Sequence, residues 1–247
     1  RNVLEELPFR DSVCWNALIS GYAQEGLGHE AVECLETMQR EGISPDVVTY
    51  ICILKACGSI GAIANGKKLH AEILQKGMVE KSVMVGNGLV DMYAKCGLLA
   101  KAQNVFEELP VRNVISWSAL IAGYAQAGQG NEAIDCFYQM QWEGISPNEV
   151  TFVCILNACS RSGLVIEGEI CFVDMSQQYG IMQDIEHHTC MIDLLSRMGR
   201  LGEAFAMVKK IPLNNDKDAT IWQPVLSASA MVGNLEFGKL AFERVFQ

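Results

Sequence analysis

Residues that could form a catalytic metal site are present only in part. His70-Ala71-Glu72 matches the first half of a zinc-deaminase signature, in which the histidine binds the metal and the glutamate transfers protons. The signature also needs Pro-Cys-x-x-Cys, and no two cysteines in the sequence have that spacing. No Ser-His-Asp set, phosphate loop or paired-carboxylate signature stands out either. The sequence therefore predicts no catalytic residue, metal or cofactor, and His70 is expected to be a packing or surface residue of a helix.

The ten cysteines are better explained by packing than by metal binding or disulfides. Cys52 and Cys57 are five residues apart, and so are Cys154 and Cys159, a spacing that does not suit a zinc ribbon. The second pair repeats the first after 102 residues, so the cysteines mark equivalent positions. Unpaired cysteine behaves as a small buried apolar residue. We expect reduced thiols and a reducing compartment.

Composition indicates a folded and acidic protein. Half of the 247 residues are hydrophobic and 19% are charged, with 19 Lys and Arg against 29 Asp and Glu, a net charge of −10. This balance argues against a generic polyphosphate-binding surface, which needs clustered basic residues. No run of eighteen apolar residues predicts a membrane span. The chain begins at Arg1 without Met or an apolar leader, so any targeting peptide is expected to be missing from this sequence.

An internal repeat organises the whole chain. Shifting the sequence by 102 residues places Trp15 on Trp117, Tyr22 on Tyr124 and Pro45 on Pro147. Inside each block lie units of about 35 residues that share an aliphatic pair near their start. The expected units are residues 12–46, 47–82, 83–113, 114–148, 149–184 and 185–218, with the tail of another unit at 1–11 and the start of a further one at 219–247.

Each unit is predicted to form two helices. In the first unit Trp15, Leu18, Ile19 and Tyr22 recur at three- and four-residue spacing, as on one face of a helix. A glycine-containing turn follows, and then a second stripe of apolar residues. A single hairpin of this kind cannot bury its apolar face, whereas stacked hairpins can. The prediction is an all-α fold, a right-handed α-solenoid superhelix of stacked helix-turn-helix repeats, with Trp15, Trp117 and Trp222 in its core.

The order of unit lengths, 35, 36, 31, 35, 36 and 34, resembles plant pentatricopeptide repeat proteins of the subclass with alternating P, L and S motifs. The segment 15–22 resembles a P motif, 53–57 an L motif and 89–97 an S motif. The resemblance covers essentially the whole chain. It implies a P repeat at 12–46, L at 47–82, S at 83–113, P at 114–148, L2 at 149–184 and S2 at 185–218, with the tail of an S-type repeat at 1–11. Steady 34-residue tetratricopeptide repeats, which bind peptides, are the alternative family.

The C-terminal segment resembles the start of an E1 motif, carried by Ala219-Thr220-Ile221-Trp222, Leu226-Ser227-Ala228 and Gly233-Asn234. Such an ending implies C-to-U editing of organelle transcripts. The sequence departs from the family pattern in two places. Pro224 falls inside the expected first helix, and the loop before 219 is about two residues longer than usual.

The resemblance also implies which residues would recognise RNA bases. In this family the fifth and the last residue of a repeat select one base on a single strand. The implied recognition pairs are Asn16 with Asp46 for uracil, Asn87 with Asn113 for a pyrimidine, Ser118 with Asn148 for adenine, and Thr189 with Asp218 for guanine. The L-type pairs, Ile51 with Ser82 and Val153 with Asp184, are expected to select little. The implied site is 5′-U-N-Y-A-N-G-3′, and the edited cytidine would lie 3′ of it.

Other positions are expected to support binding. The second residue of each repeat should sandwich the bases with apolar contacts, by Val13, Val48, Met84, Ile115 and Val150. Glu186 departs from this pattern in the sixth repeat. Lys95 and Arg197 end first helices and could meet phosphates. Simpler explanations stay open: the apolar residues could belong to the core, the final Asp and Asn residues could be helix N-caps, and the two basic residues could only favour helix C-termini.

The sequence thus favours a non-catalytic RNA-binding solenoid of a chloroplast or mitochondrion. It would position a cytidine for a deaminase domain supplied in cis or in trans, and L repeats would bind multiple organellar RNA editing factor proteins. Two alternatives stay open. One is an RNA-binding protein for splicing or transcript stabilisation, and the other is a protein-binding scaffold of the tetratricopeptide kind.

Overall fold

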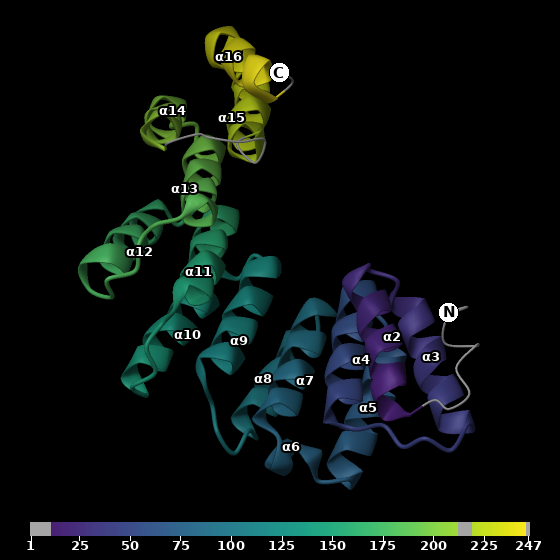
Figure 1. Ribbon diagram of the computed structural model, residues 1–247. Helices are drawn as coiled ribbons and strands as arrows, with labels where there is room; N and C mark the ends of the chain where they lie inside the picture. Colours follow the sequence, from purple (N-terminus) through teal and green to yellow (C-terminus); the bar gives the residue numbers. More distant parts are fainter. Residues whose placement is uncertain (1–10, 212–218, 246–247) are drawn as a thin grey trace. The chain divides into compact units, whose positions relative to one another are not determined.

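The computed structural model describes residues 11–211 and 219–245, and every regular element in these ranges is an α-helix (Figure 1). This confirms the predicted all-α fold. The chain divides into two compact units, residues 1–123 and 124–247, each described here by itself. The repeat tail predicted at 1–11, apart from Asp11, and the predicted junction at 212–218 lie outside the described residues.

The first unit is built from consecutive helices that pair as hairpins. Neighbouring hairpins pack through their first helices, so that α2 contacts α4 and α4 contacts α7. The helices are α2 (Ser12–Gln24), α3 (Gly28–Arg40), α4 (Val47–Ile60), α5 (Ile63–Gln75), α6 (Met78–Lys81), α7 (Val83–Lys95), α8 (Leu99–Glu107) and most of α9 (Val114–Gln126).

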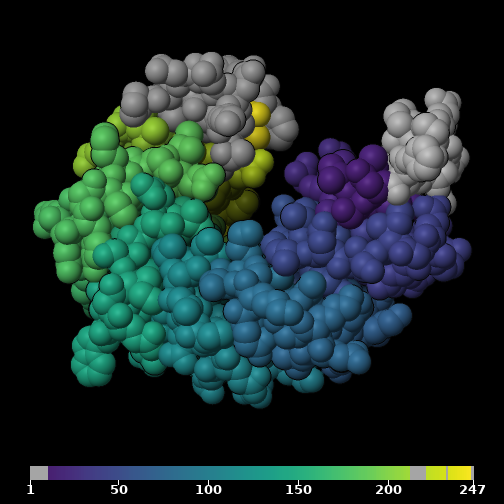
Figure 2. Space-filling view, turned by 60° about the horizontal axis from the view of Figure 1, so that its bottom comes forward, coloured from purple at the N-terminus to yellow at the C-terminus, as the bar shows by residue number. Residues whose placement is uncertain are grey.

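The second unit repeats the same arrangement. Its first helices contact in the order α11, α13 and α15, and each packs on its own second helix. In the space-filling view of Figure 2, segments that follow one another within each unit adjoin on the face shown. The helices are the end of α9, α10 (Gly130–Trp142), α11 (Glu149–Ser162), α12 (Val165–Gln177), α13 (Ile185–Arg197), α14 (Leu201–Lys210), α15 (Ala219–Val232) and α16 (Leu235–Val245).

Local chemistry sets where the first helices begin. Asp46 caps α4, Asn148 caps α11 and Asp184 caps α13, each accepting from N–H groups that the helix leaves unpaired. Each of the three helices starts at the residue that follows its cap. The glycine turns then end the helices: Gly61 (φ +66°) and Gly163 (φ +70°) adopt the left-handed conformation that closes a helix C-terminus.

Buried aromatic contacts hold the hairpins of each unit together. In the first unit the rings of Phe106 and Trp117 meet edge to face with centroids 4.5 Å apart. In the second unit Trp222 packs against Phe205, with centroids 5.7 Å apart. Trp15, Trp117 and Trp222 are all at most 5% exposed, which confirms their predicted place in the core.

Two local features depart from the regular pattern of the repeats. A short helix, α6, lies between α5 and α7 in the first unit. In the second unit α15 continues through Pro224, which lacks an N–H and therefore costs the helix one hydrogen bond without ending it.

All ten cysteines lie in the described ranges, and no disulfide joins any two of them. His70 lies in α5, where its Nδ1 is 3.0 Å from the Tyr93 hydroxyl, so it is a packing residue. Over residues 11–211 and 219–245 no group of three metal-binding side chains is found, and none of the helices is long and apolar enough to cross a membrane.

Candidate nucleic-acid interface

The first implied recognition pair is formed by direct hydrogen bonds. Asn16 lies in α2 and Asp46 precedes α4, and Nδ2 of Asn16 is 3.0 Å from both carboxylate oxygens of Asp46. Asn16 is 8% exposed and Asp46 is half-buried. Burial tends to raise the pKa of Asp46, but hydrogen bonds from Thr49 and Asn16 outweigh it and leave that pKa below its usual value. The pair is therefore an amide held against a carboxylate anion.

A third residue completes this cluster. Thr49, fully buried in the first turn of α4, donates its hydroxyl to Oδ1 of Asn16 at 2.6 Å. Its backbone N–H donates to Asp46 at 2.9 Å, and its hydroxyl oxygen accepts the N–H of Asp46 at 3.1 Å. Asp46 is thus a helix N-cap and a partner of Asn16 at once, so the capping explanation and the recognition role are compatible.

The second implied pair is also in contact. Nδ2 of Asn87, in α7, donates to Oδ1 of Asn113 at 3.2 Å. The same oxygen of Asn113 accepts the N–H of Ser116 at 3.0 Å and so caps α9. Asn87 is 5% exposed, and its Oδ1 has no hydrogen-bond partner among the described residues.

In each of the other two implied pairs, the two members do not both lie in one described unit. Ser118 is buried in the first unit, whereas Asn148 belongs to the second and caps α11 by accepting the N–H of Thr151 at 3.0 Å. Thr189 is half-buried in α13 and donates its hydroxyl to the carbonyl of Ile185 at 2.7 Å. Its implied partner, Asp218, lies outside the described residues.

The L-type positions offer little to a base. Ile51 and Val153 are half-buried and apolar, and Ser82 makes no side-chain capping bond. Asp184 instead caps α13, where its carboxylate accepts N–H groups of Glu186 and His187 at 2.9 and 3.1 Å. Weak base selectivity in these two repeats stays a prediction.

The apolar second positions face solvent and are not core residues. Side chains at these positions are between 51% and 69% exposed: Val13, Val48, Met84, Ile115 and Val150. The other large apolar side chains of these helices are mostly buried, so apolar residues as exposed as these are unusual and indicate a binding surface. Glu186, the predicted exception, is exposed as well.

Both predicted phosphate contacts are held in ion pairs on their own helices. Lys95 Nζ is 2.7 Å from Asp91, and Arg197 Nε is 2.8 Å from Asp193, each one helical turn away. The basic side chains are 43% and 58% exposed, so these pairs are partly solvated. Because such exposed ion pairs are weak, Lys95 and Arg197 can exchange their carboxylate partners for a phosphate group.

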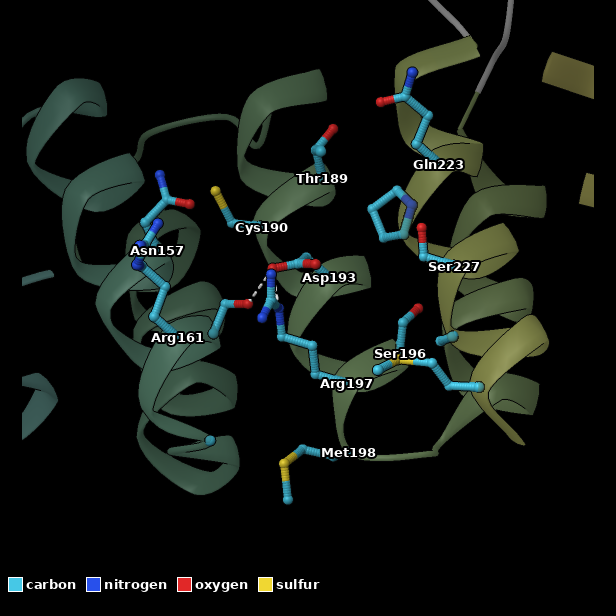
Figure 3. A pocket seen from close by; sticks show the side chains of 15 residues that line it. Asn157, Arg161, Thr189, Cys190, Asp193, Ser196, Arg197, Met198, Gln223 and Ser227 are labelled. Carbon is cyan, nitrogen blue, oxygen red and sulfur yellow. Dashed lines mark hydrogen bonds and ion pairs between the residues drawn. The ribbon is translucent and has the colours of Figure 1, made fainter. Parts of the chain in front are cut away.

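A groove of about 890 Å³ lies among α11, α13 and α15 of the second unit (Figure 3). Figure 3 shows Arg161 from α11, Thr189 and Arg197 from α13, and Gln223 and Ser227 from α15 around it. Its wall is mixed, with Pro224 and Met231 beside polar and charged side chains. The Ser160 hydroxyl and Arg197 both donate to Asp193 there, at 2.5 and 2.8 Å. The groove contains one implied base-recognition residue and one implied phosphate contact.

Three residues at or near the implied site were missed by sequence reasoning. Arg161 is exposed, lines the groove, and stands at the same place in its repeat as Lys95 and Arg197, a register signal that could have revealed it. Thr49 and His187 both occupy the third position of their repeats. His187 is fully buried, with Nδ1 2.5 Å from Asp184 and Nε2 3.0 Å from the Glu149 carbonyl.

Stacked helical hairpins with polar pairs at their junctions define a helical-repeat protein. Its family follows from comparison with known proteins. The profile described as "PPR repeat family" matches residues 10–59 and 112–161, and the one described as "PPR repeat" matches 87–114, 150–178 and 186–215. Together these matches cover well over half of the chain, which belongs to the pentatricopeptide repeat (PPR) family.

Curated relatives from Arabidopsis thaliana match nearly the full chain. Pentatricopeptide repeat-containing protein At4g33990 is 41% identical over 100% of this chain and 30% of its own length. The chloroplastic relative At3g57430 is 38% identical over 96% of this chain and 28% of its own, and the mitochondrial relative At1g77170 is 39% identical over 97% and 51%. The chain therefore spans only between 28% and 51% of the length of these three relatives.

Solved structures support the fold. The crystal structure of the pentatricopeptide repeat protein PPR10 from maize matches with a TM-score of 0.57 at 15% identity, over 98% of this chain and 39% of that one. PPR10 in complex with an 18-nt psaJ RNA element matches with a TM-score of 0.56 at 15% identity, over 99% of this chain and 43% of that one.

Proposed function

We propose that this chain binds single-stranded RNA and recognises one base per repeat at the junctions between hairpins. The observation that supports this most directly is the contact of Asn16 with Asp46 and of Asn87 with Asn113, two pairs that the family resemblance implies. Amide and carboxylate groups can donate and accept toward the edges of bases. Membership of the PPR family and the RNA complex of the related PPR10 are consistent with this function.

The proposed target is 5′-U-N-Y-A-N-G-3′, with the repeats in the P, L and S order given above and the start of an E1 motif from 219. The exposed second positions would lie against the faces of the bases. Aromatic stacking contributes about 1–3 kcal/mol per base, and aliphatic contacts contribute less. Because the chain carries a net charge of −10, nonspecific attraction to RNA would be weak and base contacts would provide most of the selectivity.

The biological role that fits this target is the selection of a cytidine for C-to-U editing of an organelle transcript. In this role the chain is not itself the enzyme, and the deaminase domain acts in cis or in trans. Relatives designated chloroplastic and mitochondrial are consistent with an organelle. Splicing or transcript stabilisation is the competing role. Measuring the editing of the target transcript in plants that lack the gene would separate the two roles, because only the editing role predicts that editing is lost.

A partner protein is the second element of the proposal. Three apolar side chains face solvent along α12, in the repeat predicted to be of the L2 type: Ile166 at 69%, Ile170 at 46% and Val173 at 45% exposure. They recur at four- and three-residue spacing and so form one stripe of the helix. This stripe would be the contact for multiple organellar RNA editing factor proteins, and an I166D/I170D variant should abolish such binding while RNA binding persists.

The test of RNA recognition is a binding assay with 5′-U-N-Y-A-N-G-3′ oligonucleotides and the double variant Ser118→Thr with Asn148→Asp. The fourth position should change its preference from adenine toward guanine, while the first and third positions keep theirs. Unchanged relative affinities for A- and G-containing RNA would contradict the register. Absence of binding to any RNA, together with tight peptide binding, would favour a protein-binding scaffold instead.

A further inference from the structure

The hydroxyl of Thr49 gives the first recognition pair a single arrangement. The carboxylate of Asp46 only accepts hydrogen bonds, so the amide atom of Asn16 that faces it at 3.0 Å must be the nitrogen. The amide oxygen then faces Thr49, whose hydroxyl donates to it at 2.6 Å. A hydroxyl has one proton, and the distance from Thr49 Oγ1 to Asp46 is longer, at 3.1 Å. The proton therefore goes to Asn16.

Both ends of the Asn16 amide are therefore held. The amide oxygen accepts a hydrogen bond from Thr49, and one N–H of the amide nitrogen donates to Asp46. The second N–H of the amide is left for a ligand. Thr49 is 0% exposed and Asn16 is 8% exposed, so water does not readily replace these bonds. Rotation of the amide would break the bond to Thr49 and place oxygen against the carboxylate.

The third repeat lacks this arrangement. The equivalent residue, Ser116 at the third position of α9, donates its hydroxyl to the backbone carbonyl of Asn113 at 2.8 Å. Its hydroxyl oxygen also accepts the N–H of Asn113 at 2.8 Å. Within the described residues Oδ1 of Asn87 is buried and has no partner. The amide of Asn87 therefore keeps a free acceptor that the amide of Asn16 does not have.

We propose that Thr49 is a specificity-determining positioning residue: by occupying the oxygen of Asn16 it leaves the first repeat with an N–H and a carboxylate, which favours uracil over cytosine. This inference rests on the proposed RNA binding. Uracil presents N3–H to the carboxylate and a carbonyl oxygen to the N–H. When the amide oxygen is free it can accept from N4–H₂ of cytosine, so that the repeat tolerates both pyrimidines. Asn87, with its free oxygen, represents that permissive state.

The test compares Thr49→Val, which removes the hydroxyl and keeps the shape, with Thr49→Ser, which keeps the hydroxyl. Thr37→Val is the matched control, because Thr37 is half-buried in α3 and its hydroxyl bonds only within that helix, donating to the Glu33 carbonyl and accepting from Arg40. Single-stranded RNAs of the form 5′-U-N-Y-A-N-G-3′ carry U or C at the first or at the third position. Dissociation constants give a U-to-C ratio for each position, and thermal unfolding reports stability.

In Thr49→Val the ratio at the first position should fall by about threefold to tenfold, the range expected for one hydrogen bond, while the ratio at the third stays constant. Thr49→Ser and Thr37→Val should keep the ratios of the unmodified protein. If valine prevents folding, Thr49→Ala is measured in its place with the same expectation.

Other outcomes contradict the inference in distinguishable ways. Equal loss of affinity for U- and C-containing RNA with an unchanged ratio would mean that Thr49 only stabilises the helix start. An unchanged ratio with full affinity would show that the amide does not need the hydroxyl. If the unmodified protein binds none of the RNAs, the proposed function itself fails, and this inference fails with it.

Discussion

Nδ2 of Asn16 lies 3.0 Å from both carboxylate oxygens of Asp46, although thirty residues separate the two in the sequence. The contact exists because α2 and α4 are the first helices of neighbouring hairpins and pack side by side. Asp46 also caps α4, so one carboxylate fixes the start of a helix and the position of a recognition amide. Stability and selectivity are therefore coupled at this residue, but they can be separated by substitution.

Asp46→Asn should change selectivity with little effect on stability. Asparagine is as good an N-cap as aspartate, but it replaces the carboxylate that would accept N3–H of uracil with an amide like that of Asn113. The preference for uracil over cytosine at the first position should weaken. Asp46→Ala removes the cap as well and should lower the free energy of unfolding by about 1 kcal/mol. Urea unfolding and RNA titrations measure the two effects, and a large stability loss in Asp46→Asn would contradict the separation.

Lys95→Gln and Arg197→Gln should reduce the salt dependence of RNA binding. Each phosphate contact that is lost should make the slope of log K against log salt shallower by about 0.7 for a single strand. Arg40→Gln is the control, because Arg40 ends α3, a second helix, and bonds within that helix. Titrations between low and moderate salt give the slopes. Equal slopes for all variants would assign Lys95 and Arg197 to helix stabilisation alone.

Gly123→Ala should destabilise the first unit because α9 approaches α7 closely at this residue. An added Cβ would lie 2.6 Å from Cβ of Ala94, and that atom is fixed to a helix backbone. The overlap should cost about 1–3 kcal/mol, more than the 0.5–1 kcal/mol that alanine contributes to a helix. Gly21→Ala is the matched control in α2, where a Cβ meets nothing within 4 Å, and it should be stabilising. Denaturant unfolding of both variants checks the sign of each change.

Acid should weaken the second unit partly through Asp184. Burial tends to raise the pKa of this carboxyl, but hydrogen bonds from His187 and Glu186 lower it overall, below the ordinary value of about 3.9. A carboxyl with a lowered pKa in the folded state contributes stability above its unfolded pKa and loses that contribution as the pH falls through the folded pKa. Asp184→Asn keeps an N-cap without this titration, so its melting temperature should fall less between pH 6 and about 2.5.

The control for this prediction is Asp135→Asn, at an exposed position of α10. Its melting temperature should follow that of the unmodified protein at every pH. If Asp184→Asn and the unmodified protein lose stability in parallel, the Asp184–His187 contact does not contribute to the acid sensitivity.

The sequence alone was sufficient for the helical fold, because apolar spacing, glycine turns and capping residues are local signals. It also located Trp15 and Trp117 in the core through the repeat register. The resemblance to a known family implied that Asn16 pairs with Asp46 and Asn87 with Asn113. The base preferences and the repeat types are still predictions. The resemblance placed Pro224 inside a first helix, and α15, packed against α13 and α16, does run through it.

Only the tertiary structure decided how polar atoms share their hydrogen bonds. The sequence shows Thr49 and Ser116 as equivalent small hydroxyl residues, yet one bonds to a recognition amide and the other to the backbone of Asn113. It likewise gives no role to His187, which is buried between Asp184 and the Glu149 carbonyl. Differences of a few tenths of an ångström decide which acceptor a hydroxyl or imidazole bonds to. These distances depend on how the hairpins pack, and the order of residues along the chain does not reveal them.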